Sequence, residues 1–271
     1  MERFLLIHNK SFFDKTHIFT INNDNDIPNE NSILFIGSHS QSIDTMDYIK
    51  KYFNVIKTKP YNYVIIVGKS DGILRINSDI PKNIKCIYAN NTNYNHPIIK
   101  FLPMGCDFRS ISNFNKADIN NKNRDILCYC NFSTNTHPIR SYIYSILQNK
   151  DFILLENMGK FLNYSISRDT FFERLGNSKY TICPRGNAFD TFRFYDTIYS
   201  GSIPIVVKEH FHHLPLFDEI PILFLEKEED YGNLTKEFLE EKYQELSKKN
   251  KNYYESFDFN VFINNIQNSL I

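Results

Sequence analysis

Short runs of apolar, β-favouring residues recur along this chain of 271 residues, and segments with helical spacing separate them. Each run is four or five residues long and apolar on both sides, which is typical of strands buried between layers of helices. The expected strands are 4–7, 33–36, 63–67, 85–88, 99–102, 126–130, 152–155, 180–183, 203–207 and 222–225. The expected helices are 42–52, 137–148, 168–176, 190–200 and 234–249. This alternation predicts an α/β fold with mostly parallel sheets.

A polar, asparagine-rich stretch at 111–124 interrupts this alternation near the middle of the chain. Its composition is that of a linker over the surface. We therefore expect two Rossmann-like domains, 1–120 and 121–271, facing each other across a cleft. The last helices of the second domain are expected to pack back across both domains.

Composition narrows the classes of function. The 31 basic and 31 acidic side chains give a formal net charge of +0, which disfavours a nucleic-acid partner. Five scattered cysteines in mostly apolar stretches indicate reduced, structural thiols and a cytoplasmic protein. No uninterrupted apolar run is long enough to predict a transmembrane segment, and the first residues do not resemble a signal peptide. The lack of a G-x-G-x-x-G fingerprint argues against a Rossmann oxidoreductase.

The densest polar motif lies in the stretch from Lys179 to Val207, which is expected to form a strand, a turn, a helix and a second strand. In the turn, Gly186 lets the backbone approach a ligand closely, and Arg185 can make bidentate bonds to a phosphate. Asp190 or Thr191 is expected to cap the following helix, whose N-terminus favours anions.

The helix of this motif is expected to have two different faces. Asp190, Arg193 and Thr197 are spaced to share a polar face, whereas Phe192 is expected on the apolar, core-facing side. Gly201 is expected to end the helix. A plain strand–helix–strand unit explains the apolar pattern but does not require these charged residues to converge at one strand end.

The same stretch resembles the donor-binding segment of exostosin-type glycosyltransferases. The matching positions are Cys183-Pro184-Arg185-Gly186, then Thr191-x-Arg193-x-Tyr195-Asp196, then Gly201-Ser202-Ile203-Pro204-Ile205-Val206. The stretch is similar also to the ribitol xylosyltransferase branch, which has an acidic residue at the position of Asp190. The resemblance implies a GT-B fold, with the acceptor on the side of the N-terminal domain and the nucleotide-sugar donor in the C-terminal domain.

The resemblance further implies an inverting, metal-independent glycosyltransferase. It would move a hexose or pentose from a nucleoside diphosphate donor, expected to be a UDP-sugar, to a hydroxyl of a glycan or glycoconjugate, with no cofactor and no bound metal. Without a metal, arginines and a helix N-terminus must meet the charge of the diphosphate, for which we expect Arg185 and Arg140, followed by Arg193 and Lys160. The predicted donor-binding residues are Asn131, Ser133, Arg140, Arg185, Gly186, Asn187, Asp190, Thr191, Arg193 and Asp196.

The general base is expected to come from the N-terminal domain, with His39 and Asp71 as candidates and His8 as a further one. His39 suits best because a histidine pKa lies near neutrality. The Asp24-Asn25-Asp26 run and the His210, His212 and His213 group are not expected to bind a metal. The alternative function is a catalytically silent, nucleotide- or sugar-binding subunit of a glycosylation complex.

Overall fold

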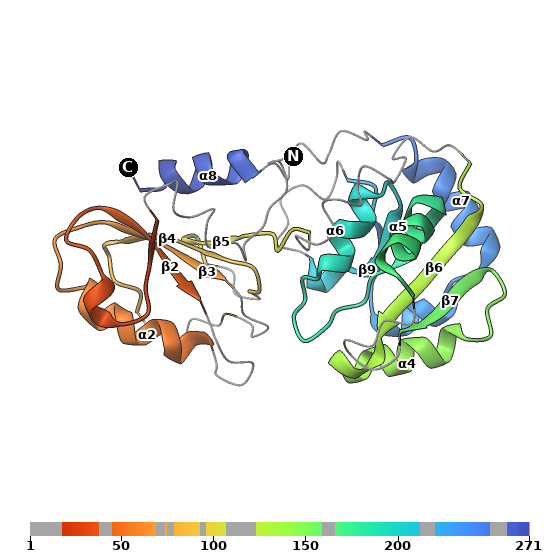
Figure 1. Cartoon of the computed structure of the whole chain (residues 1–271), viewed down its shortest axis with the longest axis horizontal. Helices are drawn as coiled ribbons and strands as arrows, with labels where there is room; N and C mark the ends of the chain where they lie inside the picture. Colours follow the sequence, from red (N-terminus) through yellow and green to blue (C-terminus); the bar gives the residue numbers. More distant parts are fainter. Residues whose placement is uncertain are drawn as a thin grey trace. The chain divides into compact units, whose positions relative to one another are not determined.

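The computed structural model describes residues 18–37, 45–68, 74, 79–92, 96–106, 123–158, 166–211, 220–249 and 259–270. They form two compact units, shown in Figure 1: an N-terminal unit, Glu2–Gly105 with Phe257–Ile271, and a C-terminal unit, Cys106–Ser256. Each unit contains one five-stranded sheet in which every described pair of strands is parallel. The predicted α/β class with two Rossmann-like domains is confirmed.

The N-terminal unit carries its strands in sequential order. They are β1 (Ile18–Thr20), β2 (Ser32–Gly37), β3 (Tyr63–Gly68), β4 (Ile84–Ala89) and β5 (Ile99–Phe101), with helices α2 (Thr45–Ile56) and α8 (Phe259–Asn268) and the 3-10 helix η1 (Asp24–Asp26). Strand β1 was not expected from the sequence. The expected strand at 4–7 lies outside the described residues.

Both faces of the N-terminal sheet are covered, which explains why its strands are apolar throughout. Leu34 and Ile36 of β2 lie in the core cluster that includes the buried residues of α2. The alternate residues Ile33 and Phe35 lie in a second cluster with Ile266 of α8. Helix α8 therefore lies over the face of the sheet opposite to α2 (Figure 1).

The last helix is tied to the N-terminal sheet by polar contacts as well. The Tyr88 hydroxyl donates to the carbonyl of Asn265 at 3.2 Å and lies 3.0 Å from the Ser269 hydroxyl. These contacts place α8 with the N-terminal unit, whereas the sequence analysis assigned 121–271 to the second domain. The compact units also divide at Gly105 and Cys106 instead of at 120 and 121.

The C-terminal unit has the strand order β10-β9-β8-β6-β7. The strands are β6 (Ile126–Ser133), β7 (Ile153–Met158), β8 (Ser178–Ile182), β9 (Ile203–Val207) and β10 (Leu223–Leu225). The helices are α4 (Pro138–Leu147), α5 (Arg168–Asn177), α6 (Phe192–Tyr199) and α7 (Lys236–Leu246), with 3-10 helices η3 (Thr134–Thr136), η4 (Lys208–His210) and η5 (Glu228–Asn233).

Helices cover both faces of this sheet too. Cys128 and Cys130 of β6 pack in one cluster with Ile143 of α4 and Leu239 of α7. On the other face, the ring of Tyr129 lies 6.3 Å from that of Phe171 in α5. The cysteines of the unit are thus small core residues, and within the described residues every cysteine is a buried free thiol.

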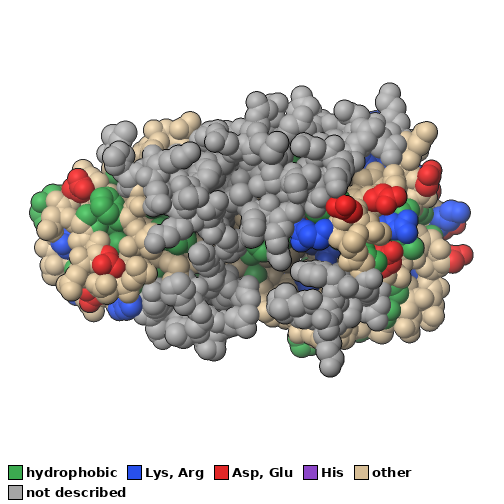
Figure 2. All heavy atoms as spheres, in the orientation of Figure 1, with side chains coloured by type: hydrophobic (Ala, Val, Ile, Leu, Met, Phe, Trp, Pro, Cys, Tyr) green, Lys and Arg blue, Asp and Glu red, His purple; other side chains and the backbone are tan. Residues whose placement is uncertain are grey.

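The surface agrees with the balanced composition. Figure 2 shows acidic and basic side chains of the described residues interspersed on the face in view. Among those residues, every helix is too short or too polar to span a membrane.

Gly201 ends α6 as expected. Its φ of 70° lies in the left-handed region, and its N–H donates to the carbonyl of Ile198 at 2.9 Å. The next N–H, of Ser202, donates to the carbonyl of Thr197 at 3.1 Å, so the last carbonyls of the helix are satisfied as the chain turns into β9.

Gly201→Ala is expected to lower the free energy of unfolding by about 1–2 kcal/mol, because a Cβ is strained at this positive φ. The matched control is Gly232→Ala, where an added Cβ would lie 3.7 Å from Ile146 Cδ1, an ordinary contact. It should leave stability unchanged or raise it by up to ~1 kcal/mol. Urea denaturation of both variants checks this, and equal losses would contradict it.

Candidate functional site

The order of the C-terminal sheet points to one edge as a binding site. Strand β6 lies inside the sheet. The next strand in the chain, β7, pairs with β6 on one side, and β8, β9 and β10 follow in order on its other side. In open parallel sheets, ligands collect beyond the carboxyl ends of the strands where the order reverses. That switch point lies between β6 and β8, and the segments that leave it are 131–140 and 183–193. Seven of the ten predicted donor-binding residues lie in the turns or at the strand ends of these segments, whereas Arg140 lies on α4 and Arg193 and Asp196 lie on α6.

The side chain of Arg140, in α4, joins these two segments by hydrogen bonds to backbone carbonyls of both. Its Nε donates to the carbonyl of Arg185 at 2.7 Å, its Nη1 to that of Ser133 at 3.2 Å, and its Nη2 to that of Pro184 at 3.2 Å. Burial, and then the neighbouring charge of Arg193, lower the pKa of Arg140 to about 9. These carbonyls occupy three of the five N–H donors of Arg140, so Arg140 has a structural role in the turn, and its expected contact with a diphosphate stays a prediction.

Gly186 is buried beside this arginine. A Cβ built at Gly186 would lie 3.2 Å from Arg140 Nη2 and 3.8 Å from Thr136 Oγ1. Arg140 therefore limits the space for a side chain at Gly186, and the predicted approach of a ligand to the Gly186 backbone stays a prediction. Asn187, the next residue, is exposed, and its carbonyl accepts from Arg185 Nη2 at 3.1 Å.

The guanidinium of Arg185 lies half-buried at the rim of the site. Its Nε donates to the carbonyl of Gly186 at 3.2 Å, and its Cζ lies 4.2 Å from the ring centroid of Phe189. Burial lowers the pKa of Arg185, while Glu228 and Glu209 act in the opposite direction. Arg185 therefore places its guanidinium near solvent, where the group packs against the Phe189 ring.

Arg193 and Asn131 hold unsatisfied polar groups inside the same region. Within the described part of the chain, Nε and Nη1 of Arg193 are shielded from solvent and make no hydrogen bond. Both side-chain amide atoms of the fully buried Asn131 are in the same situation. The guanidinium of Arg193 lies 5.3 Å from the ring centroid of Phe171. Buried polar groups without partners are rare in folded proteins, and they mark places where a ligand or water completes the structure.

Asp190 and Asp196, the acidic residues of the motif, differ from the expectation in their positions relative to helix α6 and in their contacts. Helix α6 begins at Phe192, with Thr191 as an N-cap that makes no side-chain capping hydrogen bond. Asp190 precedes the cap, is buried, and accepts a hydrogen bond from the Tyr195 hydroxyl at 2.9 Å. Asp196 is buried within the helix, and no ion pair joins it to Arg193 among the described residues.

Thr136 and His137, which were not predicted as site residues, border the site next to the predicted Ser133. Ser133 caps η3 by accepting from the N–H of Asn135 at 3.4 Å, and His137 caps α4 through its Nδ1. Burial lowers the pKa of His137, and the nearby charges of Arg185 and Arg140 lower it further. The hydroxyl of Thr136 is buried and makes no hydrogen bond within the described chain. The position of these residues directly after a predicted strand was the available signal.

A carboxylate on the neighbouring strand was missed as well. Glu156 lies in β7, and its Oε2 accepts from the Tyr129 hydroxyl at 2.6 Å. Its Oε1 lies 3.5 Å from Arg174 Nε. Burial, and then the hydrogen bond and charge of Glu156, raise the pKa of Tyr129, so this hydroxyl stays protonated and donates.

Some of the predicted residues cannot be placed. His8, His39, Asp71, Lys160, His212 and His213 lie outside the described residues. The Asp24-Asn25-Asp26 run forms η1, where the Asp26 carboxylate accepts from the N–H groups of Asn22 and Asn23 at 2.7 and 3.0 Å. These bonds lower the pKa of Asp26. The run therefore caps a turn.

Comparison with known proteins adds an independent finding. The model of the exostosin GT47 domain matches residues 83–222, which include β6, β8, α6 and β9. Among solved structures, the chain is similar to a crystal structure of an α1,3-fucosyltransferase, with 12% identity, a TM-score of 0.47, and coverage of 90% of this chain and 79% of that chain. A search of curated proteins finds no significant match.

The family match takes in the whole of the switch-point region and more than half of the 271 residues. It agrees with the resemblance read from the stretch between Cys183 and Val206. The chain belongs to the exostosin GT47 family of glycosyltransferases.

Proposed function

We propose that this chain transfers a sugar from a uridine diphosphate donor to a hydroxyl group of a glycan or glycoconjugate. The transfer proceeds with inversion at the anomeric carbon and without a metal ion in the chemical step. The bond between that carbon and the diphosphate breaks as the acceptor oxygen attacks from the opposite side. The leaving diphosphate gains negative charge in this step, so the donor site must supply positive charge.

The observation that carries this proposal is that Nε and Nη1 of the partly buried Arg193, at the switch point, are shielded from solvent and make no hydrogen bond within the described residues. Its charge lies near that of the buried Arg140 and lowers the pKa of that group. Two neighbouring positive charges with little solvent repel each other, and a bound anion relieves that repulsion. A diphosphate fits this requirement, because its oxygens accept several charge-assisted hydrogen bonds at once.

The residues around Arg193 have separate roles in the proposed site. Arg193 contacts the diphosphate from inside, and Arg185 contacts it from the rim. Arg140 is a positioning residue, because its hydrogen bonds hold the turn that carries Arg185. The amide of Asn131 offers both a donor and an acceptor to the donor's nucleoside or sugar.

The acceptor hydroxyl must lose a proton during transfer, and a base from the N-terminal unit remains our hypothesis for this role. His39 and Asp71 are the candidates. A base in that unit would be consistent with a donor site built entirely from the C-terminal unit.

A uridine nucleotide is expected to stabilise the folded protein by ~2–4 kcal/mol at ligand concentrations near 100–1,000 times Kd. Thermal unfolding with uridine, guanosine and cytidine diphosphates checks this expectation. A shift with the guanosine or cytidine compound and none with the uridine compound would contradict the donor assignment. A uridine diphosphate that binds while no UDP-sugar is ever turned over would favour the catalytically silent subunit instead.

A further inference from the structure

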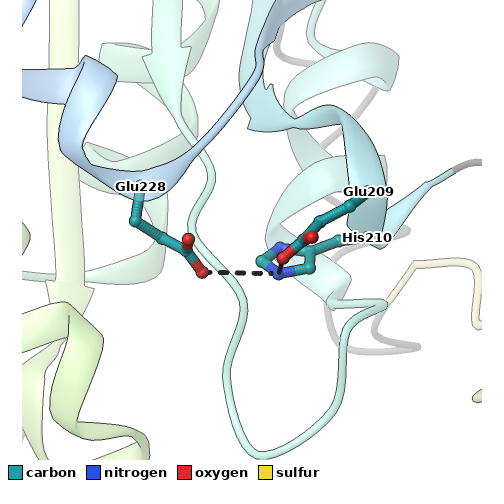
Figure 3. Close-up of side chains that lie close together, drawn as sticks. All are labelled: Glu209, His210 and Glu228. Atoms are coloured by element: carbon teal, nitrogen blue, oxygen red, sulfur yellow. Dashed lines mark ion pairs between the residues drawn. The ribbon is translucent and has the colours of Figure 1, made fainter.

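A second cluster of polar side chains lies at the same edge of the C-terminal sheet, beyond β9 and β10 (Figure 3). It consists of Glu209 and His210 from η4 and Glu228 from η5. His210 Nε2 lies 3.4 Å from Glu209 Oε1 and 3.4 Å from Glu228 Oε1. The potential ligand atoms of the three residues all lie within 4.8 Å of one another.

The three side chains differ in how much of their surface is exposed to solvent. The side chain of His210 is 4% exposed, that of Glu228 23% and that of Glu209 70%. The imidazole is stacked on the Phe189 ring, with centroids 4.9 Å apart and an angle of 19° between the planes. The cluster therefore offers a buried ring nitrogen, a half-buried carboxylate and an outer, solvent-exposed carboxylate.

The spacing does not suit hydrogen bonding from one ring nitrogen. Charge-assisted N–H···O bonds are about 2.7–2.9 Å long, which is shorter than both separations from His210 Nε2. Two ligand atoms bound at ~2.1 Å to one tetrahedral ion lie ~3.4 Å apart. Both separations from His210 Nε2 match that value.

We propose that Glu209, His210 and Glu228 bind one divalent transition-metal ion, with Zn²⁺ as the preferred species. Zinc takes histidine nitrogen and carboxylate oxygen together, whereas Mg²⁺ and Ca²⁺ favour oxygen ligands alone. The ion joins η4 to η5 and holds His210 against Phe189, whose ring also contacts Arg185. It is a structural ion, because its ligands come from neither the turn after β8 nor α6.

Calorimetric titration of the full chain tests this site, after treatment with a chelator and dialysis, using ZnCl₂ as the probe and no sugar nucleotide. One Zn²⁺ ion per chain is expected to bind and to raise the melting temperature. Glu228→Gln and Glu209→Gln should each weaken binding by at least ~10–100-fold, since each removes a direct ligand and even second-shell losses cost this much. Glu229→Gln makes the same change at the next, exposed residue of η5 and should bind as the wild type does.

The proposal is overturned if the wild type binds no Zn²⁺, or if both cluster variants bind it with unchanged affinity, since the ion would then lie elsewhere. Should Glu228→Gln fail to fold, Glu209→Gln decides alone, because that side chain is mostly exposed. The test involves no donor, so its result does not depend on the proposed transferase activity.

Discussion

Arg193→Met is expected to lower sugar transfer by ~10²–10³-fold, or about 3–4 kcal/mol of barrier, without unfolding the protein. The loss follows from removing a buried, charge-assisted contact to the leaving diphosphate. Methionine keeps much of the volume of the side chain and still packs on the Phe171 ring. Transfer is measured with whichever UDP-sugar the wild type uses.

The stability of this variant should not fall together with its activity. In the unliganded protein, Nε and Nη1 of Arg193 are buried without hydrogen bonds, and such a charge costs free energy. Its removal is therefore expected to leave the free energy of unfolding unchanged or to raise it by ~1 kcal/mol. Urea denaturation without nucleotide measures this.

Arg124→Met is the matched control, because Arg124 is a buried arginine of the same unit with satisfied donors. Its Nη1 donates to the carbonyls of Gly176 and Ser178 at 2.8 and 3.0 Å, and its Nη2 donates to that of Ser200 at 3.1 Å. The substitution leaves these carbonyls without donors and should cost ~3 kcal/mol of stability. Equal losses of stability in both variants would show that Arg193 is structural.

Phe194→Ala is expected to lower the free energy of unfolding by ~3–5 kcal/mol through a cavity in the core. Phe194 is fully buried, and its ring centroid lies 5.1 Å from that of Tyr195 and 4.7 Å from that of Phe211. Phe194 contributes no polar group to the proposed site, so the folded fraction of the variant should retain nucleotide binding.

Phe192→Ala on the same helix is the control for this cavity, and it corrects an expectation. The helical spacing of the sequence predicted Phe192 on the core-facing side. The helix begins at Phe192, which is only partly buried. Its truncation should cost less than half as much as that of Phe194, and a larger cost for Phe192 in chemical denaturation would contradict this packing.

The strands and helices of the fold could be predicted because each depends on residues that are close together in the sequence. Strands β8 and β9 and the turn at Gly201 follow from short apolar runs and from a glycine at a helix end. The start of α6 was misplaced by two residues because Asp190 and Thr191 are both good capping residues, and Asp190 bonds instead to Tyr195, later in the helix.

The internal contacts of the site were not predictable, because they join residues far apart in the chain. Arg140 has no local signal that distinguishes a phosphate ligand from a residue that bonds the carbonyls of Pro184 and Arg185. In the same way, only the parallel pairing of β9 and β10 brings Glu228 to His210. For this reason Glu228 could not be linked to His210 from the sequence.

Direct titration of uridine diphosphate into the wild type, Arg193→Met and Arg124→Met tests the switch-point donor site most directly. The wild type and folded Arg124→Met should bind with the same affinity, and Arg193→Met should bind ~10–100-fold more weakly, as expected for a lost hydrogen bond between charged groups. Unchanged affinity in Arg193→Met, together with a loss of stability, would contradict a donor site built on this buried guanidinium.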